Sequence, residues 1–479
     1  MRRNAIFLVA GFALACLTAG CVATEAVDNQ PLPQDANGQP VYSPGYALLP
    51  LIKEPHGQVL FAAAFSGGGK RSAAFAHGVL RGLRNIPVVT DGRQRRLLDE
   101  LDLISSVSGG SFPAMHYGLY RERSFETFPT EFLHRDIEAY IYGTYLLPWH
   151  AVRLMTTDFG TNDRMAGIYD DLMFHGATYA DLERQGLPMI SIGATDIAFG
   201  IPFAFIQPSF DLICSDLSRY PVARAVAASN GFPVIFSPIT LTSHRRDCKG
   251  ARPPQALPSE WAEGSDELSR RAVLARATNR YLDADRTAYV HLMDGGIADN
   301  LAMRGTINGM IGLAPESELF RRIALQTRRL LVLSADGQAA TNPKLSQERA
   351  VTGLGQIFAA VSGTQIDAYN FETLNLARAE LATFVEEIKR ARCAHAPTID
   401  GHDCADVRGA LVHLSLQGIT DPVVRARLQA IPTGLTIPDA DVEVLVQQGE
   451  DLVQSNREIR ELIDDLDTPV AKTAAAGRR

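Results

Sequence analysis

An unbroken apolar run, rather than an alternating one, marks the first strand that this sequence predicts. Residues 59–65 are apolar throughout and lead into three glycines, which is typical of a parallel strand that is buried on both faces. Residues 101–107 form a second, only partly apolar run, which is also predicted to be a strand and leads into Ser108. Each run is followed by a turn and by a helical pattern, at 73–83 and 111–120. Repeated strand–turn–helix units predict an α/β fold of three layers, α/β/α, with a mainly parallel sheet.

Two stretches after residue 120 depart from this alternation of strands and helices. Residues 121–185 are rich in aromatic residues with few strand signals, and we expect a mainly helical insertion. It is either a lid or acyl-chain wall near the active site, or ordinary helical packing. Residues 412–416 could form a further strand in a part that is otherwise helical. Strands are also expected near 189–195, 203–206, 289–293 and 330–334, and long amphipathic helices near 365–391 and 440–466.

These patterns divide the chain without a Pro/Gly-rich linker between two catalytic domains. The expected parts are a signal peptide (1–20), a tether rich in Pro, Gly and Asn (21–57), a catalytic domain (58–340, with the insertion at 121–185), a mostly helical C-terminal part packed on it (341–467) and a disordered tail (468–479). No internal repeat is visible in the sequence.

The N-terminus reads as a targeting segment. Arg2 and Arg3 precede an apolar run at 5–17 and small residues before Cys21, which predicts export. The segment resembles the lipobox of bacterial lipoproteins, which implies a lipid on Cys21 and a place in the cell envelope. Val22 is consistent with the outer membrane, with the protein facing the periplasm or the exterior. Cys16 as the lipidated residue, and release after secretion, stay open as alternatives.

The remaining cysteines and the net charge limit the classes of partner. Four cysteines in an exported chain suggest two disulfides, for which three pairings exist. Proximity in sequence favours Cys214–Cys248 and Cys393–Cys404. No Cys/His cluster has zinc-ligand spacing, so no metal is predicted. The net charge of −8 argues against a nucleic-acid partner.

The glycine run Gly67, Gly68 and Gly69 follows the first predicted strand. Such a run lets backbone N–H groups approach a substrate closely, and it opens a helix whose dipole favours negative charge. It therefore predicts an oxyanion hole for acyl transfer. A phosphate-binding P-loop would need glycine at 64 and Ser or Thr at 71, where this chain has Ala64 and Arg71.

Ser108 and Asp294 are the candidate nucleophile and general base. Ser108 lies between a predicted strand and a helix in Ser-Val-Ser-Gly-Gly, which is close to the G-x-S-x-G elbow, with Ser106 replacing the first glycine. Ser105, Ser106 and Ser111 rank lower because only Ser108 directly precedes two glycines. Asp294 follows another predicted strand and precedes two glycines, so its carboxylate is expected at the strand end, where it can accept a serine proton.

Taken together, these motifs resemble those of the patatin-like phospholipases, which carry G-G-G-x-K/R-G, G-x-S-x-G and D-G-G/A in this order. The matching positions are Gly67, Gly68, Gly69 and Arg71, then Ser108 and Gly110, then Asp294, Gly295 and Gly296. Ser72 replaces the last glycine of the first motif. Residues 221–233 also resemble the family helix that precedes the aspartate, and the resemblance covers about residues 58–305.

The resemblance implies a serine lipid acyl hydrolase, of phospholipase A or lysophospholipase type, that uses a Ser108/Asp294 dyad. It implies no catalytic histidine, metal or cofactor, and gives His77 and His116 packing or surface roles. Arg71 would lend positive charge to the oxyanion hole or fix its loop. The implied substrate is a phospholipid or another acyl lipid. A lipid-binding envelope protein with a decayed site, and an acyltransferase using the same acyl-enzyme, are the alternatives.

Overall fold

The computed structural model of the chain describes residues 28–466 apart from 49–57, 91, 141–159, 234–235, 255, 264–267, 340–348 and 350–353. The expected signal peptide, Cys21 and the tail that begins at 468 therefore lie outside the described residues. None of the described helices is both long enough and apolar enough to cross a bilayer.

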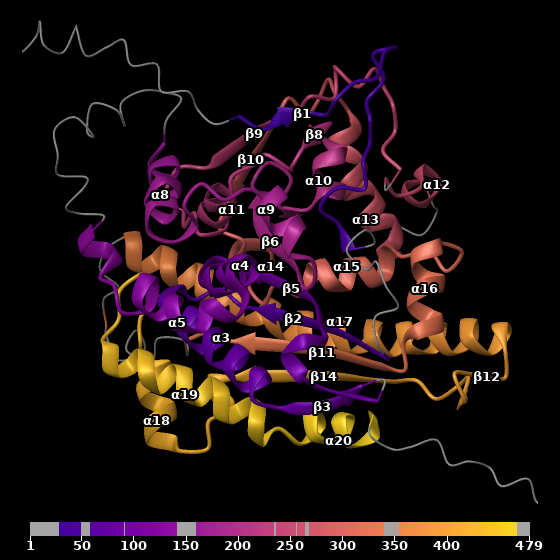
Figure 1. Cartoon of the computed structure of the whole chain (residues 1–479). Coiled ribbons are helices and arrows are strands. Elements are labelled where there is room, and N and C mark those ends of the chain that lie inside the picture. The colour runs from indigo at the N-terminus through magenta and orange to yellow at the C-terminus, as the bar shows by residue number, and fades with distance from the viewer. Residues whose placement is uncertain are drawn as a thin grey trace, which may run out of the picture.

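The centre of the fold is an eight-stranded sheet (Figure 1). Its order is β14 (Arg408–Ser415), β11 (Arg329–Asp336), β2 (Val59–Phe65), β5 (Leu101–Val107), β6 (Met189–Asp196), β10 (Tyr289–Met293) and β9 (Ile239–Thr242), and β7 (Ile201–Ala204) also pairs with β6. The five strands from β14 to β6 run parallel, whereas β10, β9 and β7 pair antiparallel. The predicted mainly parallel sheet is confirmed, with an antiparallel edge.

One face of the sheet is covered by helices from both ends of the chain. They are α3 (Gly69–Arg84), α4 (Ser111–Tyr120), α11 (Val222–Ser229), α19 (Asp439–Ser455) and α20 (Arg457–Leu466). Figure 1 shows α19 alongside α3. The two helices approach closely because Gly78 faces the Val446 carbonyl and Gly449 faces the Phe75 carbonyl, so that a side chain at either glycine would collide with backbone. α19, near the end of the described chain, thus packs on α3, near its start.

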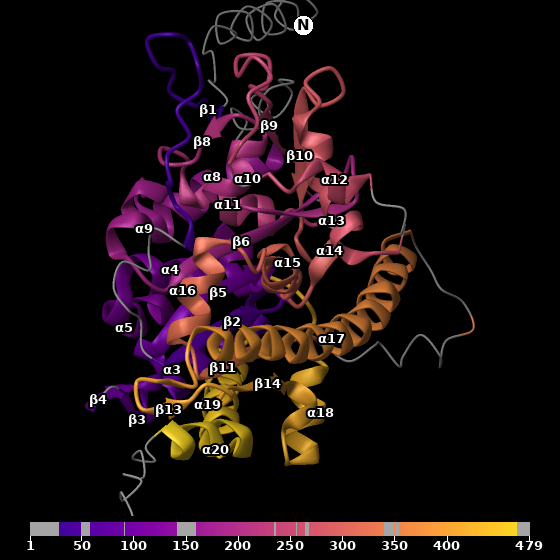
Figure 2. The ribbon, with the colours of Figure 1, turned by 90° about the vertical axis from the view of Figure 1, so that its right-hand side faces the viewer.

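The opposite face is covered by α14 (Gly296–Asp299), α15 (Arg304–Gly312), α16 (Glu318–Gln326) and α17 (Leu354–His395). Figure 2 shows the long α17 running across this side of the molecule. Phe320 and Phe384 meet edge to face there, with ring centroids 5.9 Å apart. Helices on both faces confirm the expected three-layer α/β/α architecture.

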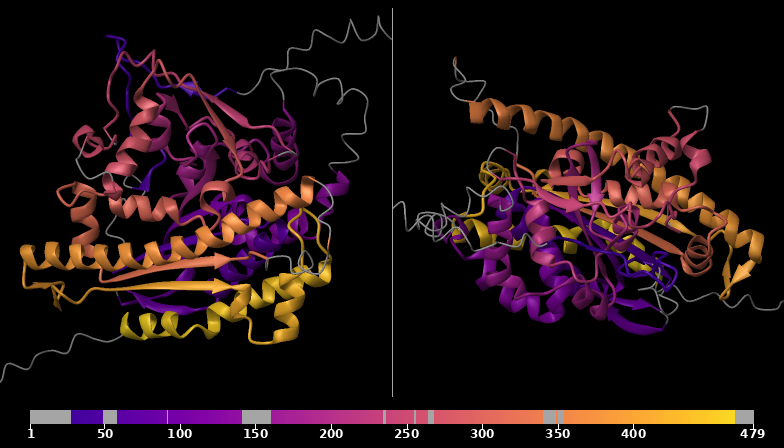
Figure 3. Two further views of the ribbon diagram at one scale, coloured as in Figure 1. Left: turned by 180° about the vertical axis from the view of Figure 1, so that it is seen from behind. Right: turned by 90° about the horizontal axis from the view of Figure 1, so that it is seen from above.

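The C-terminal part contributes a strand as well as helices. β14 pairs in parallel with β11 along its full length, and the two lie side by side in Figure 3. The boundary expected at 340 therefore falls between neighbouring strands of one sheet. The helices α17, α18 (Pro422–Gln429), α19 and α20 match the expected helical character of this part.

The expected tether at 21–57 differs from the structure between residues 28 and 48. β1 (Gln30–Pro31) pairs with β8 (Ser215–Asp216), and Leu32 is buried. Tyr46 is also buried, and its hydroxyl accepts a hydrogen bond of 2.7 Å from the Ile190 amide. A few apolar and hydrogen-bonding residues within a polar, Pro-rich segment are thus enough to hold it against the folded body.

The described part of the insertion at 121–185 is helical, with α5 (Ser124–Phe128), α8 (Thr161–Tyr169) and α9 (Tyr179–Gln185). Several of its aromatic rings are buried, although Tyr140 is exposed. Phe112 of α4 stacks on Phe132 with ring centroids 4.2 Å apart and meets Tyr169 edge to face at 4.9 Å. These contacts support the packing interpretation, while the aromatic residues of 141–159 lie outside the described residues.

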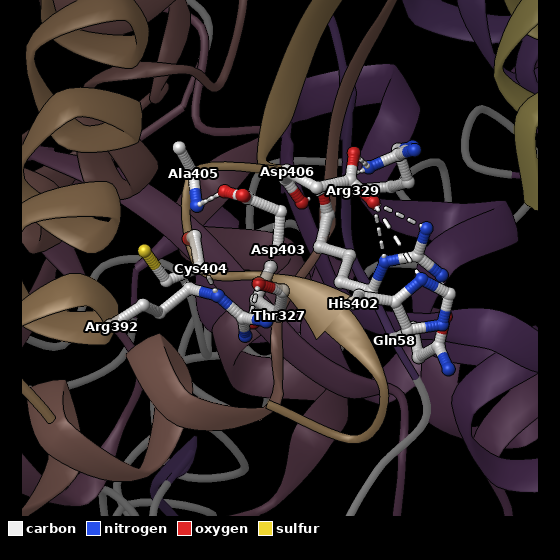
Figure 4. Close-up of polar contacts among 10 residues, drawn as sticks. Gln58, Thr327, Arg329, Arg392, His402, Asp403, Cys404, Ala405 and Asp406 are labelled. Atoms are coloured by element: carbon white, nitrogen blue, oxygen red, sulfur yellow. Dashed lines mark hydrogen bonds and ion pairs between the residues drawn. The ribbon is translucent and has the colours of Figure 1, made fainter. Parts of the chain in front are cut away.

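Ion pairs and hydrogen bonds fix the amino ends of β11 and β14, away from Ser108. Asp406 accepts hydrogen bonds from Arg328 at 3.0 Å and from Arg329 at 3.1 Å (Figure 4). Arg392 is buried and donates to the carbonyls of Thr327 and Cys404, both at 3.2 Å. The segment before β14 is thereby fixed to the start of β11.

The structure pairs the four cysteines in the way that proximity favours. Cys393 is joined to Cys404 with a Cα–Cα distance of 4.9 Å, and Cys214 to Cys248 with 6.3 Å. The remaining elements are short or peripheral. They are β3 (Pro87–Thr90), β4 (Arg93–Arg96), α10 (Gln207–Leu212), α12 (Ser259–Ala262), α13 (Arg270–Asn279), β12 (Thr398–Ile399) and β13 (His402–Asp403).

Candidate active site

Ser108 stands at a sharp turn between β5 and α4. Its φ of +48° lies in the left-handed region, which a residue other than glycine adopts at a cost of about 1–3 kcal/mol. The next residue, Gly109, lies against the Gly69 carbonyl, where any side chain would collide with backbone. Ser106 precedes the turn inside the sheet, paired with Phe65 and Ile192 in regular strands, so its side chain is accommodated. The elbow thus forms although the first glycine of the motif is replaced.

Asp294 reaches Ser108 from the antiparallel edge of the sheet. Val107 pairs with Gly193 of β6, and Met293 pairs with Thr195 two residues further along the same strand. The end of β10 is therefore brought to the level of the elbow. The Ser108 hydroxyl donates a hydrogen bond of 3.0 Å to Oδ2 of Asp294. Two residues that lie 186 positions apart are in direct contact.

Burial shifts the pKa of the Asp294 carboxyl group. Desolvation raises its pKa from 3.8 to about 6, against the opposing effect of hydrogen bonds from the Gly296 amide and from Ser108. The Gly296 N–H donates to Oδ1 at 2.8 Å, which leaves Oδ2 directed toward the serine. A carboxylate that is ionised above pH 6 and hydrogen-bonded to a hydroxyl has the properties of a general base.

The segment Ser229–Gly231 holds both candidate residues in place. Ser229 Oγ accepts from the Ser108 amide at 2.8 Å, and Asn230 Nδ2 donates to the Ser108 carbonyl at 3.0 Å. The Gly231 carbonyl accepts from the Asp294 amide at 3.1 Å. This segment ends α11, within the stretch 221–233 that resembles the family helix, but sequence reasoning assigned no site role to Ser229 or Asn230.

The glycine loop lies beside the serine, with one difference from expectation. The Gly67 N–H is engaged, since it donates to the Asn300 carbonyl at 2.9 Å, so it is not a free oxyanion donor. Gly68 and Gly69 have φ values of +135° and +61° and stand at the N-terminus of α3, a helix of 16 residues. Their conformation suits glycine, and the helix dipole there favours negative charge.

Arg71 fixes the loop rather than facing the serine. It is buried, and its guanidinium donates to the Gly337 carbonyl at 2.6 Å, to the Ile431 carbonyl and to Thr433 Oγ1 at 3.3 Å. Burial lowers the pKa of Arg71 to about 10, so it stays charged near neutral pH. Of the two roles expected for Arg71, these contacts fit the fixing of the loop.

The segment that Arg71 contacts, Ile431–Thr436, is named the C-terminal strap. Its Gly434 carbonyl accepts from the Lys70 amide at 2.8 Å, and Gly434 lies against Gly69. At its other end the strap reaches the insertion, where the Leu435 amide donates to Glu138 at 2.8 Å. The strap thus joins the glycine loop to the start of the helical insertion.

The other candidate residues lie outside this arrangement. Ser111 Oγ contacts Ser229 Oγ at 3.0 Å, and no hydrogen bond to Asp294 is found for Ser105, Ser106 or Ser111 among the described residues. His116 is held between Ser124 at 2.8 Å and Glu131 at 2.9 Å. The His77 ring packs against Phe125 and Phe128. No group of three or more metal-ligating side chains occurs in the described part of the chain.

Comparison with known proteins identifies the family. The family model for patatin-like phospholipases matches residues 63–307, slightly more than half of the 479 residues, and this range contains the glycine loop, Ser108 and Asp294. A search of curated proteins finds no match. At the level of the family, the match supports a lipid acyl hydrolase with a lipid substrate. The chain belongs to the patatin-like phospholipase family.

Proposed function

We propose that the protein is a serine lipid acyl hydrolase in which Ser108 is the nucleophile and Asp294 is the general base. The observation that carries the proposal is the 3.0 Å hydrogen bond from Ser108, at its left-handed elbow, to the buried Asp294 carboxylate. A strained serine beside a carboxylate with a raised pKa is typical of an activated nucleophile.

In the proposed first step, Asp294 takes the Ser108 proton as Oγ attacks the ester carbonyl of an acyl lipid. The amides of Gly68 and Gly69, assisted by the dipole of α3, stabilise the developing oxyanion. Asp294 then gives its proton to the departing alcohol, such as a lysophospholipid or glycerol moiety. The acyl chain is left as an ester on Ser108.

In the second step, water replaces the alcohol. Asp294 accepts a proton from the water as the water attacks the acyl-enzyme, and it returns that proton to Ser108 Oγ when the fatty acid leaves. Each proton transfer uses Asp294 alone, so the proposal requires no histidine, metal or cofactor.

A fluorophosphonate probe tests the proposed nucleophile. Purified wild-type protein is expected to be labelled covalently at Ser108. Ser108→Ala is expected to lose labelling and to lose lipid hydrolysis by about 10³-fold or more, as substitutions of the nucleophile do in other serine hydrolases. Ser111→Ala is the matched control because Ser111 lies beside the site without contacting Asp294. Labelling that is equal in wild type and Ser108→Ala would reject the nucleophile.

Absence of labelling in the wild type would instead favour the alternative of a lipid-binding protein with a decayed site. A panel of phospholipids, lysophospholipids and acylglycerols then defines the head group and the position of the bond that is cleaved. The choice between hydrolysis and acyl transfer depends on what attacks the acyl-enzyme.

We also propose that the protein is exported and anchored in the bacterial cell envelope through a lipid on Cys21. The basic start, the apolar run at 5–17 and the small residues before Cys21 support this proposal. A lipid anchor would keep the enzyme close to membrane substrates.

A further inference from the structure

The side chain of Asn230 faces the reacting oxygen in a fixed orientation. Its Nδ2 donates to the Ser108 carbonyl at 3.0 Å and to the Val226 carbonyl at 2.9 Å. Because both acceptors are carbonyl oxygens, only the amide NH₂ group can occupy that side. Oδ1 must therefore point the other way, and it lies 3.5 Å from Ser108 Oγ.

Ser108 Oγ thus has two acceptors but a single proton. Asp294 Oδ2 at 3.0 Å is the closer acceptor and takes that proton in the resting site, since a hydrogen bond weakens as it lengthens. Asn230 Oδ1, at 3.5 Å, keeps most of its capacity to accept, and among the described residues it has no nearer donor. Asn230 is only 8% exposed, so few water molecules can satisfy this oxygen from bulk solvent.

We propose that Asn230 Oδ1 receives the second hydrogen of the water that attacks the acyl-enzyme, and so favours hydrolysis over acyl transfer. This inference rests on the proposed Ser108/Asp294 chemistry. Once Ser108 is acylated it has no proton to donate, and both Asp294 and Asn230 present unused acceptors beside the ester. A water molecule can supply both of them, with one hydrogen for each.

An alcohol that attacks the acyl-enzyme has a single O–H hydrogen and can donate to only one of these two acceptors. In either reaction the O–H proton goes to Asp294 and then to Ser108 Oγ, while the acceptor oxygen forms the new bond to the acyl carbon and the Ser108 ester bond breaks. Water retains a second O–H that Asn230 can hold, whereas an alcohol carries a carbon group in its place. Asn230 therefore orients water selectively and leaves its oxygen unpaired when an alcohol attacks, which disfavours transfer.

The partition of the acyl-enzyme between water and methanol tests this role. The wild type and Asn230→Ala are given one acyl ester substrate in the presence of methanol, and the fatty acid and its methyl ester are quantified. We expect the ratio of methyl ester to fatty acid to rise about 3- to 10-fold in Asn230→Ala, the effect of one lost hydrogen bond. We also expect an acyl-enzyme burst, because deacylation by water becomes slower.

Asn230→Asp separates the acceptor oxygen from the hydrogen bonds that Nδ2 makes to the elbow. It keeps an oxygen at the position of Oδ1 but loses the donors to Ser108 and Val226. The comparison is made at pH 9, so that Asp294 and the carboxyl group introduced at position 230 are both ionised. Under these conditions the ratio of methyl ester to fatty acid is expected to lie closer to that of the wild type in Asn230→Asp than in Asn230→Ala. Asn37→Ala, in an exposed loop, serves as the control with an unchanged ratio.

The rate of fluorophosphonate labelling completes the design, because labelling requires Ser108 and Asp294 but no attacking water. Any fall in labelling reports the loss of the Nδ2 hydrogen bonds to the elbow. That loss slows hydrolysis and methanolysis alike, so a raised methyl ester ratio supports the inference whether or not labelling falls. An unchanged ratio in both variants, or an equal fall of hydrolysis and methanolysis, would refute it. If the wild type itself is not labelled, the proposed function fails rather than the role of Asn230.

Discussion

At the scale of single residues, three backbone and side-chain groups of one short segment hold the proposed dyad of Ser108 and Asp294. Ser229 and Asn230 hold the amide and the carbonyl of Ser108, and the Gly231 carbonyl holds the Asp294 amide. Ser108 and Asp294, which follow different strands, are therefore held in place by the same segment. This shared support explains how Ser108 can stay in a left-handed conformation that costs free energy.

The raised pKa of Asp294 makes activity dependent on pH. Because the base must be ionised, kcat/KM is expected to fall about tenfold per pH unit below pH 6 and to level off above it. The measurement is kcat/KM from pH 4.5 to 8.5 with an uncharged ester substrate. A profile without a change between pH 5 and 7 would contradict the assignment of Asp294 as the base.

The raised pKa of Asp294 also affects stability, which is expected to fall with rising pH while activity rises. The folded-state pKa is about 6 against an ordinary value of 3.8, so the folded state binds the proton more tightly and the contribution of Asp294 to stability falls as pH rises from 3.8 to 6. Asp294→Asn removes the buried charge. It should be inactive yet at least as stable as the wild type in urea at pH 8, whereas a large loss of stability would indicate a structural role.

At the scale of elements, the C-terminal strap holds the glycine loop through Arg71 and the Lys70 amide. The motif containing Arg71 could be found in the sequence, but its acceptors at Ile431 and Thr433 could not, since more than 350 residues separate them from it. The position of such a partner depends on how helices pack rather than on any local pattern. The same reason explains why Asn230, 122 residues from Ser108, was not predicted.

Substitutions of Arg71 distinguish geometry from charge. Arg71→Lys keeps the positive charge but not the three-way hydrogen bonding, so we expect it to lose activity nearly as strongly as Arg71→Met. Both are expected to lower the free energy of unfolding by about 2–4 kcal/mol, because carbonyl groups are left unpaired. Urea unfolding and lipid hydrolysis measure the two effects, with the exposed Arg460 replaced by Met as control. Full activity of Arg71→Lys would show that charge alone suffices.

At the scale of the whole molecule, the sequence allowed the layers and most central strands to be predicted, because unbroken apolar runs identify buried parallel strands. It placed Ser108 and Asp294 at turns but could not show that β10 runs antiparallel to β6, because the long connection between them is compatible with either direction. The tether predicted at 21–57 is held against the folded body between residues 28 and 48, and the sequence does not reveal this because the few buried residues there lie among polar ones.

The proposed anchor is a property of the whole molecule that fractionation can test. Cys21→Ser is expected to move the protein from the membrane to the soluble fraction of the cell envelope while hydrolysis by the purified protein stays unchanged. Cys16→Ser is the matched control and should stay with the membrane. Unchanged membrane association of Cys21→Ser, with release of Cys16→Ser, would assign the lipid to Cys16 instead.

The pairing of β14 with β11 has a consequence for the biosynthesis of this protein. A chain that has emerged only as far as residue 400 would leave the apolar β11 at the edge of the sheet and would lack the carbonyl acceptors of Arg71. Exposed apolar edge strands favour aggregation. Catalysis would then begin only after the C-terminal part of the chain has been synthesised and has folded onto the sheet. An incomplete or proteolysed molecule would therefore hydrolyse no lipid.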